Sequence, residues 1–219
     1  MFVTDEPAIV LGKTLIVADL HIGITRELYE HGVKIPSQTK PIADRINKLK
    51  KKTKTSRLVI LGDVKHKVPG VSYQEIMEIP EFFSLLKFRD IVIVKGNHDG
   101  NIERLVSAKV KKSLAVGDYL LTHGHRNART NKNIIIGHNH PHIKFRDKLG
   151  ATYVEPCWVR GKIGEREVIM MPAFNKLCGA TIVNEQTLLG PIAKRIKFAK
   201  AYLLDGTDLG YLKDLKIRK

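Results

Sequence analysis

The sequence predicts an α/β fold in which two β-sheets pack against each other within one domain. Short runs of Leu, Ile and Val, bounded by glycine, recur along the chain and have the length of buried strands. Amphipathic helical segments separate the first of these runs, which is typical of parallel strands. After Val110 helical segments become rare and short strands follow one another closely, which indicates a second, more antiparallel sheet.

Three apolar runs in the first half, over residues 15–18, 58–61 and 91–94, predict parallel strands. Leu, Ile and Val dominate each run without polar alternation, as expected for strands that are buried on both faces. In a parallel sheet, ligands bind beyond the carboxyl ends of the strands. Polar residues that directly follow these runs are therefore candidates for a functional site.

Two amphipathic helices are expected between these strands, over residues 36–51 and 72–86. The apolar stripe of the first, opposite a face of Lys and Arg, consists of Ile42, Ile46 and Leu49. Ser72 and Glu75 have the spacing of a capping box at the start of the second helix. Pro80 predicts a break or a kink inside that helix, because proline lacks the donor that the helix needs.

The second half of the chain is predicted to be mainly β-structure. The expected strands cover residues 118–122, 133–137, 151–160, 167–173, 201–204 and 210–212. No linker, repeat or low-complexity tract divides the chain, so we expect a single domain over residues 1–219. Its best internal seam lies near residue 110, between the two sheets.

The charge of the chain favours a polyanionic partner. Among its 219 residues, 38 Lys and Arg outnumber 22 Asp and Glu, which gives a formal net charge of +16. Nucleic acid is one partner that such an excess attracts. A lysine-rich surface that keeps the protein in solution explains the same number, because composition does not say where the charges lie.

Three further observations bear on whole classes of protein. No apolar run approaches the ~20 residues of a membrane-spanning helix, so no contact with a membrane is expected. With only Cys157 and Cys178, the chain has no disulfide framework and no four-cysteine zinc site. The first ten residues include acidic ones and do not resemble a secretory signal. The expected location is therefore the cytoplasm.

Side chains that can bind metal follow five of the apolar runs. They are Asp19 and His21, Asp63, Asn97 with His98 and Asp99, His123, and His138 with His140. Taken singly, each is also explained as a helix cap, a turn or a loop residue. Carboxylate, imidazole and amide oxygen together suit Mn, Fe, Zn, Ni or Mg. A carboxylate such as Asp63 can bridge two ions, the arrangement of two-metal hydrolases.

In order along the chain, these motifs resemble the five motifs of the calcineurin-like metallophosphoesterases. The matching motifs are Asp19-x-His21, Gly62-Asp63, Gly96-Asn97-His98-Asp99, His123-Gly124 and Gly137-His138-x-His140. None of the usual positions is missing, and the motifs span a little over half of the chain. The resemblance implies a two-sheet α/β/β/α sandwich and a centre with two divalent ions. Mn²⁺ is the first choice, with Ni²⁺, Zn²⁺, Fe and Mg²⁺ as alternatives.

The resemblance also implies a role for each motif residue. One ion takes Asp19, His21, Asp63 and His140, and the other takes Asp63, Asn97, His123 and His138. His98 is expected not to bind metal but to donate a proton to the leaving oxygen or to stabilise the transition state, and an imidazolium beside a scissile phosphate suits the first role. Asp99 is expected to orient the His98 ring.

Three segments resemble one branch of the family, the ligase-associated phosphoesterases of bacteria and their archaeal relatives. They are Gly62-Asp63-Val64-Lys65-His66, Pro156-Cys157-Trp158 and Met171-Pro172-Ala173-Phe174-Asn175.

Cys157 and Cys178 are expected to be small buried residues rather than nucleophiles. Trp158 is expected in the core, with base stacking as the alternative.

The main functional hypothesis is a metal-dependent phosphodiesterase that acts on a phosphodiester such as DNA or RNA. Water activated by the ions attacks phosphorus in line, and His98 assists the departure of the alkoxide. Candidate substrate contacts are His66, Arg126 and Arg129, of which the arginines also fit an exposed polar loop. The alternatives are a phosphomonoesterase or cyclic-nucleotide phosphodiesterase, and a metal-containing DNA-binding scaffold without catalysis. The oligomeric state stays open.

Overall fold

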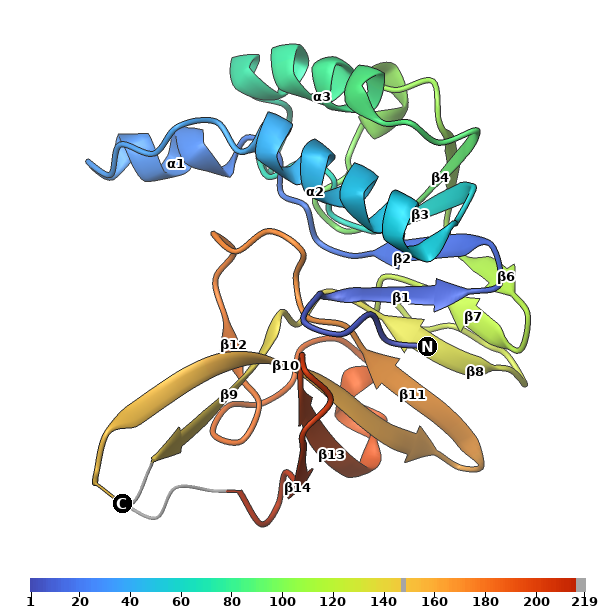
Figure 1. Ribbon diagram of the computed structural model, residues 1–219, viewed down its shortest axis with the longest axis vertical. Helices are drawn as coiled ribbons and strands as arrows, with labels where there is room; N and C mark the ends of the chain where they lie inside the picture. Colours follow the sequence, from blue (N-terminus) through green and yellow to red (C-terminus); the bar gives the residue numbers. More distant parts are fainter. Residues whose placement is uncertain (147–148, 216–219) are drawn as a thin grey trace.

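Two β-sheets lie face to face, two long α-helices cover the outer face of the first sheet, and a short α-helix extends to the side (Figure 1). This computed structural model describes residues 1–146 and 149–215. The predicted two-sheet α/β fold is confirmed. On the outer face of the second sheet, the helical layer among the described residues is the short 3₁₀ helix η2 (Ala193–Arg195), which packs with Ile192 onto the sheet.

The first sheet is parallel except at one edge. Its order is β1-β2-β3-β4-β5, in which β2 to β5 run parallel and β1 is antiparallel. Its strands are β1 (Ala8–Leu11), β2 (Thr14–Val17), β3 (Arg57–Leu61), β4 (Asp90–Val94) and β5 (Lys109–Lys111). The three central strands confirm the three predicted runs. The edge strand β5 was not predicted, because its sequence is Lys-Val-Lys, and both lysines are exposed.

The predicted amphipathic segments form α2 (Thr39–Thr53) and α3 (Tyr73–Leu85). The expected stripe of α2, namely Ile42, Ile46 and Leu49, is buried against the first sheet. Burial of each such side chain contributes about 1.5–3 kcal/mol to stability. The short helix α1 (Ile24–Glu30) was not predicted, and His31 lies at its C-terminal end.

The start of α3 confirms the predicted capping box, and of the break or kink predicted at Pro80 the break does not occur. The Ser72 side chain accepts from the Glu75 main-chain N–H at 3.2 Å, and Glu75 Oε2 accepts from the Ser72 N–H at 2.6 Å. The helix is not broken at Pro80. Pro80 is exposed, so water can satisfy the carbonyl that loses its helical partner.

The second sheet is mixed, and most of its strand pairs are antiparallel, which confirms the prediction of a sheet more antiparallel than the first. Its order is β12-β9-β10-β11-β8-β7-β6, with β13 paired to both β10 and β14. The strands are β6 (Leu114–Val116), β7 (Tyr119–Leu121), β8 (Asn133–Ile136), β9 (Pro141–Arg146), β10 (Thr152–Ile163), β11 (Arg166–Met170), β12 (Thr181–Ile182), β13 (Lys197–Leu203) and β14 (Asp208–Tyr211). Among them β7, β8 and β11 run parallel, so the carboxyl ends of β7 and β8 lie at one edge.

Apolar side chains from both sheets share one core layer. Val59 and Val92 of the first sheet pack in the same cluster as Ile135 and Trp158 of the second. Trp158 is fully buried and stacks on Phe2 with ring centroids 4.3 Å apart, which confirms its expected place in the core. This shared layer joins the two sheets, and the chain passes from one sheet to the other after β5, near residue 110.

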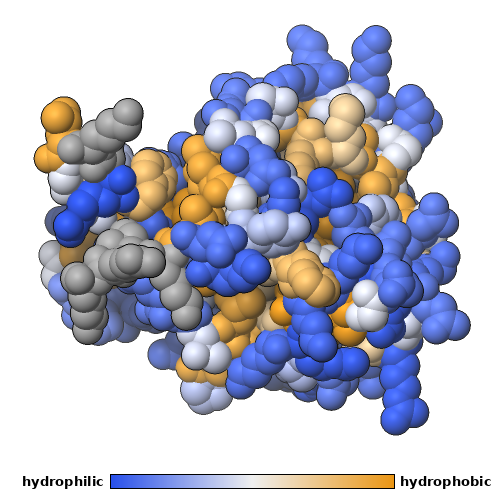
Figure 2. Space-filling model, turned by 90° about the horizontal axis from the view of Figure 1, so that it is seen from below, coloured by the Kyte–Doolittle hydropathy of each residue, from blue (hydrophilic) through white to orange (hydrophobic). Residues whose placement is uncertain are grey.

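The surface below the second sheet is mostly hydrophilic, with hydrophobic residues visible between the polar ones (Figure 2). Within residues 1–146 and 149–215, no helix has the length and apolar character needed to span a membrane.

The 3₁₀ helix η1 (Ile102–Arg104) lies in the connection between β4 and β5. The loops after β2, β3, β4, β7 and β8 carry the candidate site.

Candidate metal centre

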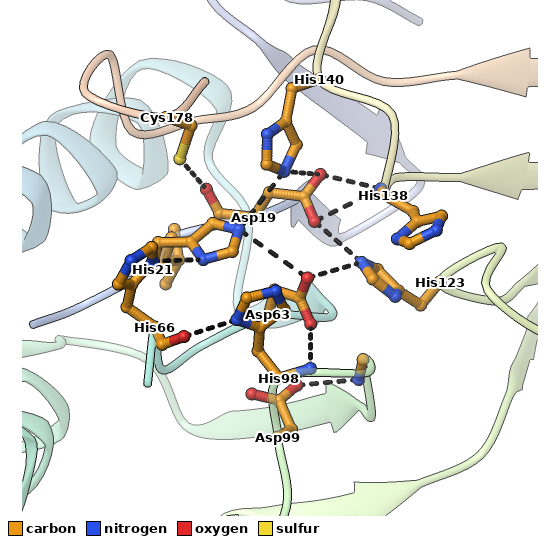
Figure 3. Close-up of polar contacts among 12 residues, drawn as sticks. Asp19, His21, Asp63, His66, His98, Asp99, His123, His138, His140 and Cys178 are labelled. Carbon is orange, nitrogen blue, oxygen red and sulfur yellow. Dashed lines mark hydrogen bonds and ion pairs between the residues drawn. The ribbon is translucent and has the colours of Figure 1, made fainter. Parts of the chain in front are cut away.

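Side chains from both sheets point toward one another where these five strands end (Figure 3). Asp19 and His21 follow β2, Asp63 follows β3, and His98 follows β4 in the first sheet. In the second sheet, His123 follows β7, and His138 and His140 follow β8. The parallel direction of the strands within each sheet therefore gathers residues that are up to 121 positions apart (Asp19 to His140).

Two buried carboxylates and His123 form the centre of this cluster. His123 Nε2 lies 2.9 Å from Asp19 Oδ1 and 3.4 Å from Asp63 Oδ2. His123 and Asp19 are fully buried, and Asp63 is 2% exposed. Buried carboxylates are costly unless they are paired or coordinate a cation. The arrangement is therefore one that a metal ion would stabilise.

His21 and His140 lie on one side of the two carboxylates. Their Nε2 atoms are 3.3 Å apart. His21 Nε2 is 3.7 Å from Asp63 Oδ2, and His140 Nε2 is 3.8 Å from Asp19 Oδ2. These separations match the spacing of ligand atoms around one ion at about 2.0–2.2 Å from each of them.

His138 lies on the other side, with His123. One donor atom each from Asp63, His123 and His138 lie within 4.8 Å of one another. The His138 main-chain N–H also donates to Asp19 Oδ2 at 3.1 Å, which ties β8 to the loop after β2. Asn97, the remaining predicted ligand, lies at the exposed surface between Gly96 and His98.

Five of the cluster residues have backbone conformations that non-glycine residues rarely adopt. Their φ angles are Asp19 56°, His21 43°, Asp63 46°, His138 73° and His140 43°. A positive φ at such residues costs about 1–3 kcal/mol each and persists only where the surroundings enforce it. Such strain concentrates at functional sites, so the backbone supports the assignment that the side chains suggest.

The glycines of the motifs leave room for these side chains. A Cβ at Gly62 would lie 2.2 Å from His123 Cδ2, and one at Gly137 would lie 2.7 Å from Asp19 Oδ2. Gly62 also has φ +83°, a conformation that glycine adopts at no steric cost. The sequence therefore places glycine where the two sheets bring backbone and ligand side chains together.

The outer nitrogens of three histidines have partners of their own. His21 Nδ1 lies 3.1 Å from His66 Nδ1, and His66 Nε2 lies 2.7 Å from Glu27 Oε2. His140 Nδ1 donates to the carbonyl oxygen of Gly179 at 2.9 Å. Such partners orient the rings of metal-binding histidines. His66, predicted as a substrate contact, thus lies against His21, and no sequence pattern indicated Glu27.

His125 lies near the His123-Gly124 motif, and the sequence left open whether it contacts substrate or a metal ligand. Its Nδ1 lies 3.0 Å from His123 Nδ1, on the side of His123 that faces away from Asp19. Only its spacing of two residues from His123 could have indicated this contact, because side chains at i and i+2 of an extended segment lie on the same side.

His98 is held against the cluster by two hydrogen bonds. Its main-chain N–H donates to Asp63 Oδ1 at 2.8 Å, and its Nδ1 donates to the carbonyl oxygen of His66 at 2.5 Å. Because that carbonyl oxygen only accepts, Nδ1 carries a proton and Nε2 is the free nitrogen.

Asp99 has a different set of partners from the one expected. Asp99 Oδ1 accepts from the main-chain N–H groups of Val64 at 2.8 Å and Lys65 at 3.3 Å, and Oδ2 accepts from Gly96 at 2.8 Å. The expectation that Asp99 orients the His98 ring is therefore wrong for this structure, where the His66 carbonyl does so. Asp99 joins the loops after β3 and β4, and it is fully buried.

Comparison with known protein families decides the assignment of the chain. The calcineurin-like phosphoesterase family matches residues 12–173, which include every motif residue. The chain belongs to the calcineurin-like phosphoesterase family. A search of curated proteins finds no match.

Two solved structures resemble this calcineurin-like phosphoesterase. One is the Pseudomonas putida nuclease MPE, with a TM-score of 0.61 and 21% identity, covering 90% of this chain and 88% of the other. The other is YfcE, a phosphoesterase from E. coli, with a TM-score of 0.40 and 16% identity, covering 76% and 83% respectively. At these identities the likeness to the first structure supports the fold, and the second adds no argument.

Burial and mutual charge set the protonation of the cluster in the absence of metal. Burial opposes ionisation of Asp19, but His140 and His123 outweigh it and hold the pKa of Asp19 well below its usual range. Burial raises the pKa of Asp63 to about 6, and the charges of Asp19 and Asp99 act in the same direction. Burial and then His123 lower the pKa of His138 to about 4.

The donor set fits the divalent ions that the family uses. Asp19, His21, Asp63 and His140 can hold one ion, and Asp63, His123 and His138 offer donors to a second. Carboxylate and imidazole suit Mn, Fe, Zn, Ni and Mg, so these residues do not select one metal. At neutral pH the low pKa of His138 leaves its ring unprotonated, as a ligand must be.

A basic pocket adjoins the candidate metal centre. The pocket has a volume of about 400 Å³, and its lining includes Lys95, Lys112, Arg126 and Arg129. His125 and Gly96 also line the pocket. His125 contacts His123, and Gly96 lies close to Asp63. Of the four cations, Lys95 is paired with Glu103 at 2.6 Å. Both arginines predicted as substrate contacts thus line a pocket that shares His125, the partner of His123, with the surroundings of the centre.

Proposed function

We propose that this calcineurin-like phosphoesterase is a phosphodiesterase that works with two divalent metal ions. The observation that carries the proposal is the convergence of Asp19, His21, Asp63, His123, His138 and His140, with the free nitrogen of His98 beside them. Bound ions of this kind lower the pKa of water and polarise phosphoryl oxygens.

Each predicted ligand has a place in this proposal. Asp19, His21 and His140 serve the first ion, Asn97, His123 and His138 serve the second, and Asp63 lies between the two. Asn97 has the least support of these, because it is exposed. Mn²⁺ is the first ion to assay, followed by Ni²⁺, Zn²⁺, Fe²⁺ and Mg²⁺.

The role proposed for His98 is proton donation to the leaving oxygen. Since His98 Nδ1 donates its hydrogen bond to the carbonyl oxygen of His66, Nε2 is the atom that can give a proton to the alkoxide. Asp99 supports this arrangement indirectly, because it joins the loop that carries Lys65 to the loop that begins at Gly96.

The proposed substrate class is a phosphodiester, and nucleic acid is the polymer to test first. The basic pocket beside the centre supports this choice, because arginine and lysine bind phosphate oxygens. The similar structure from P. putida is that of a nuclease, which agrees with the choice.

The proposed location is a reducing cytoplasm, and the free cysteines support it.

The deciding experiment compares hydrolysis of bis-p-nitrophenyl phosphate, p-nitrophenyl phosphate and labelled DNA or RNA. With Mn²⁺ present we expect the diester to be hydrolysed faster than the monoester, and chelation to abolish the activity. A higher rate on the monoester would support a phosphomonoesterase. Tight DNA binding without hydrolysis of any of these esters would support the scaffold and contradict the proposal.

A further inference from the structure

The Cys178 thiol lies beside the candidate metal centre, and the roles assigned above do not use it (Figure 3). Its Sγ is 3.8 Å from the main-chain oxygen of Asp19. One ring nitrogen each of His21 and His140, together with this Sγ, lie within 4.8 Å of one another. Zinc binds sulfur at about 2.3 Å and imidazole nitrogen at about 2.0–2.1 Å, so one ion can reach all three atoms.

The segment that carries Cys178 is fastened to the same ligands. The Gly179 carbonyl accepts from His140 Nδ1 at 2.9 Å, which turns Nε2 of that ring toward Asp19. The Asn175 side chain donates to the carbonyl of Leu20 at 2.7 Å, and the Cys178 N–H donates to the Asn175 carbonyl at 3.3 Å. The thiol is therefore positioned by the residues that flank His21 and by the contact of His140.

We propose that Cys178 is a further ligand of the ion held by His21 and His140, which makes this half of the centre thiophilic. The inference rests on the proposed function, because it requires that centre. On binding, the S–H bond breaks, the electron pair stays on sulfur and binds the ion, and the proton passes to solvent. Thiolate is a softer ligand than carboxylate or imidazole, so it increases the preference of this site for Zn²⁺ or Cd²⁺ over Mn²⁺ and Mg²⁺.

The second cysteine offers a matched control. Cys157 is fully buried in the apolar cluster of the second sheet, among Val159 and Met170. Replacing Cys157 by Ala removes the other thiol without touching the candidate centre. Replacing Cys178 by Ser keeps the size of the side chain but exchanges sulfur for oxygen.

The test is titration of the full chain with Cd²⁺, and separately with Co²⁺, in the ultraviolet. Sulfur bound to either ion gives a charge-transfer band, and calorimetry in parallel gives the number of ions bound. We expect the band in the wild-type and Cys157→Ala proteins and its loss in Cys178→Ser. We also expect the affinity for Cd²⁺ relative to Mn²⁺ to fall about tenfold or more in Cys178→Ser, a loss typical of groups around a metal site.

Two results would overturn the inference, and they separate it from the proposed function. Wild-type protein that binds its ions without the band has a metal centre in which Cys178 takes no part. A band that persists in Cys178→Ser has the same meaning. Protein that binds no ion at all would instead remove the centre itself, and the proposed function with it.

Discussion

Gly96 leaves the space that the Asp63 carboxylate occupies: a Cβ at Gly96 would lie 2.1 Å from Asp63 Oδ1 and 2.4 Å from the Asp63 main-chain nitrogen. No real side chain tolerates such distances, so the loop after β4 approaches the loop after β3 closely only because glycine is there. The same approach brings the His98 N–H to Asp63 Oδ1.

The first prediction follows from this contact. Gly96→Ala is expected to destabilise the protein by about 1–3 kcal/mol, because the backbone of Asp63 must shift. It should also weaken metal binding. Gly100→Ala is the matched control, since a Cβ there meets nothing within 4 Å. Thermal unfolding and metal calorimetry check both variants, and equal behaviour of the two would contradict the role of Gly96.

Removing His98 should slow the reaction without removing the metal. For His98→Ala we expect kcat on the diester to fall about 10²- to 10⁴-fold, the usual contribution of general acid catalysis. Calorimetry with Mn²⁺ should give the same stoichiometry as for wild type. His31→Ala removes an exposed histidine at the end of α1 and should leave kcat unchanged. Undiminished turnover in His98→Ala would refute proton donation by this residue.

His66 should act on metal affinity through His21. Because His66 lies against His21 Nδ1, His66→Ala removes the group that orients this ring. We expect metal affinity to fall about 10- to 100-fold, as found when partners of metal-binding histidines are removed. A change in KM for the diester with unaltered metal affinity would instead make His66 a substrate contact.

Metal affinity should rise with pH. Burial raises the pKa of Asp63 to about 6 in the metal-free protein, so at pH 5 most of the protein carries a protonated, non-binding carboxyl. Metal must displace that proton, which lowers the apparent affinity between pH 7 and pH 5 by about tenfold or more. His138 adds little in this range, because its pKa is lowered to about 4. Calorimetry at both pH values checks the sign, and an affinity that is equal or higher at pH 5 would contradict it.

The basic pocket should bind phosphates of a polymer. Arg126→Ala and Arg129→Ala are each expected to raise KM for DNA or RNA more than for bis-p-nitrophenyl phosphate. Each should also reduce the slope of log affinity against log salt by about 1 if it removes one phosphate contact. Lys51→Ala removes an equal charge from the exposed C-terminal turn of α2. If Lys51→Ala changes KM and the salt dependence equally, the net charge of the protein rather than the basic pocket determines nucleic-acid binding.

The sequence predicted the parts of the site that depend on strand ends. Asp19, Asp63 and His123 each follow an apolar run, and the parallel direction of the strands then determines that they meet. The central strands and α2 were predictable for a related reason, because the pattern of apolar and polar residues within each segment shows which side chains are buried. Pro80 shows the limit of local rules, because an exposed helical turn tolerates the proline.

Contacts between loops could not be predicted from the sequence. The partners of Asp99 are main-chain N–H groups at Val64 and Gly96, and such donors leave no mark on residue identity. Cys178 and Glu27 reach the centre only because their segments fold back on it, through hydrogen bonds that no spacing rule predicts. The positive φ angles of the ligands are likewise a consequence of tertiary structure.

The most direct test of the metal centre is anomalous diffraction from crystals loaded with Mn²⁺ and measured at the absorption edge of manganese. Two peaks about 3.5–4 Å apart, one on each side of Asp63, are the result that a two-metal centre predicts. A single peak, or peaks remote from Asp63, would contradict it.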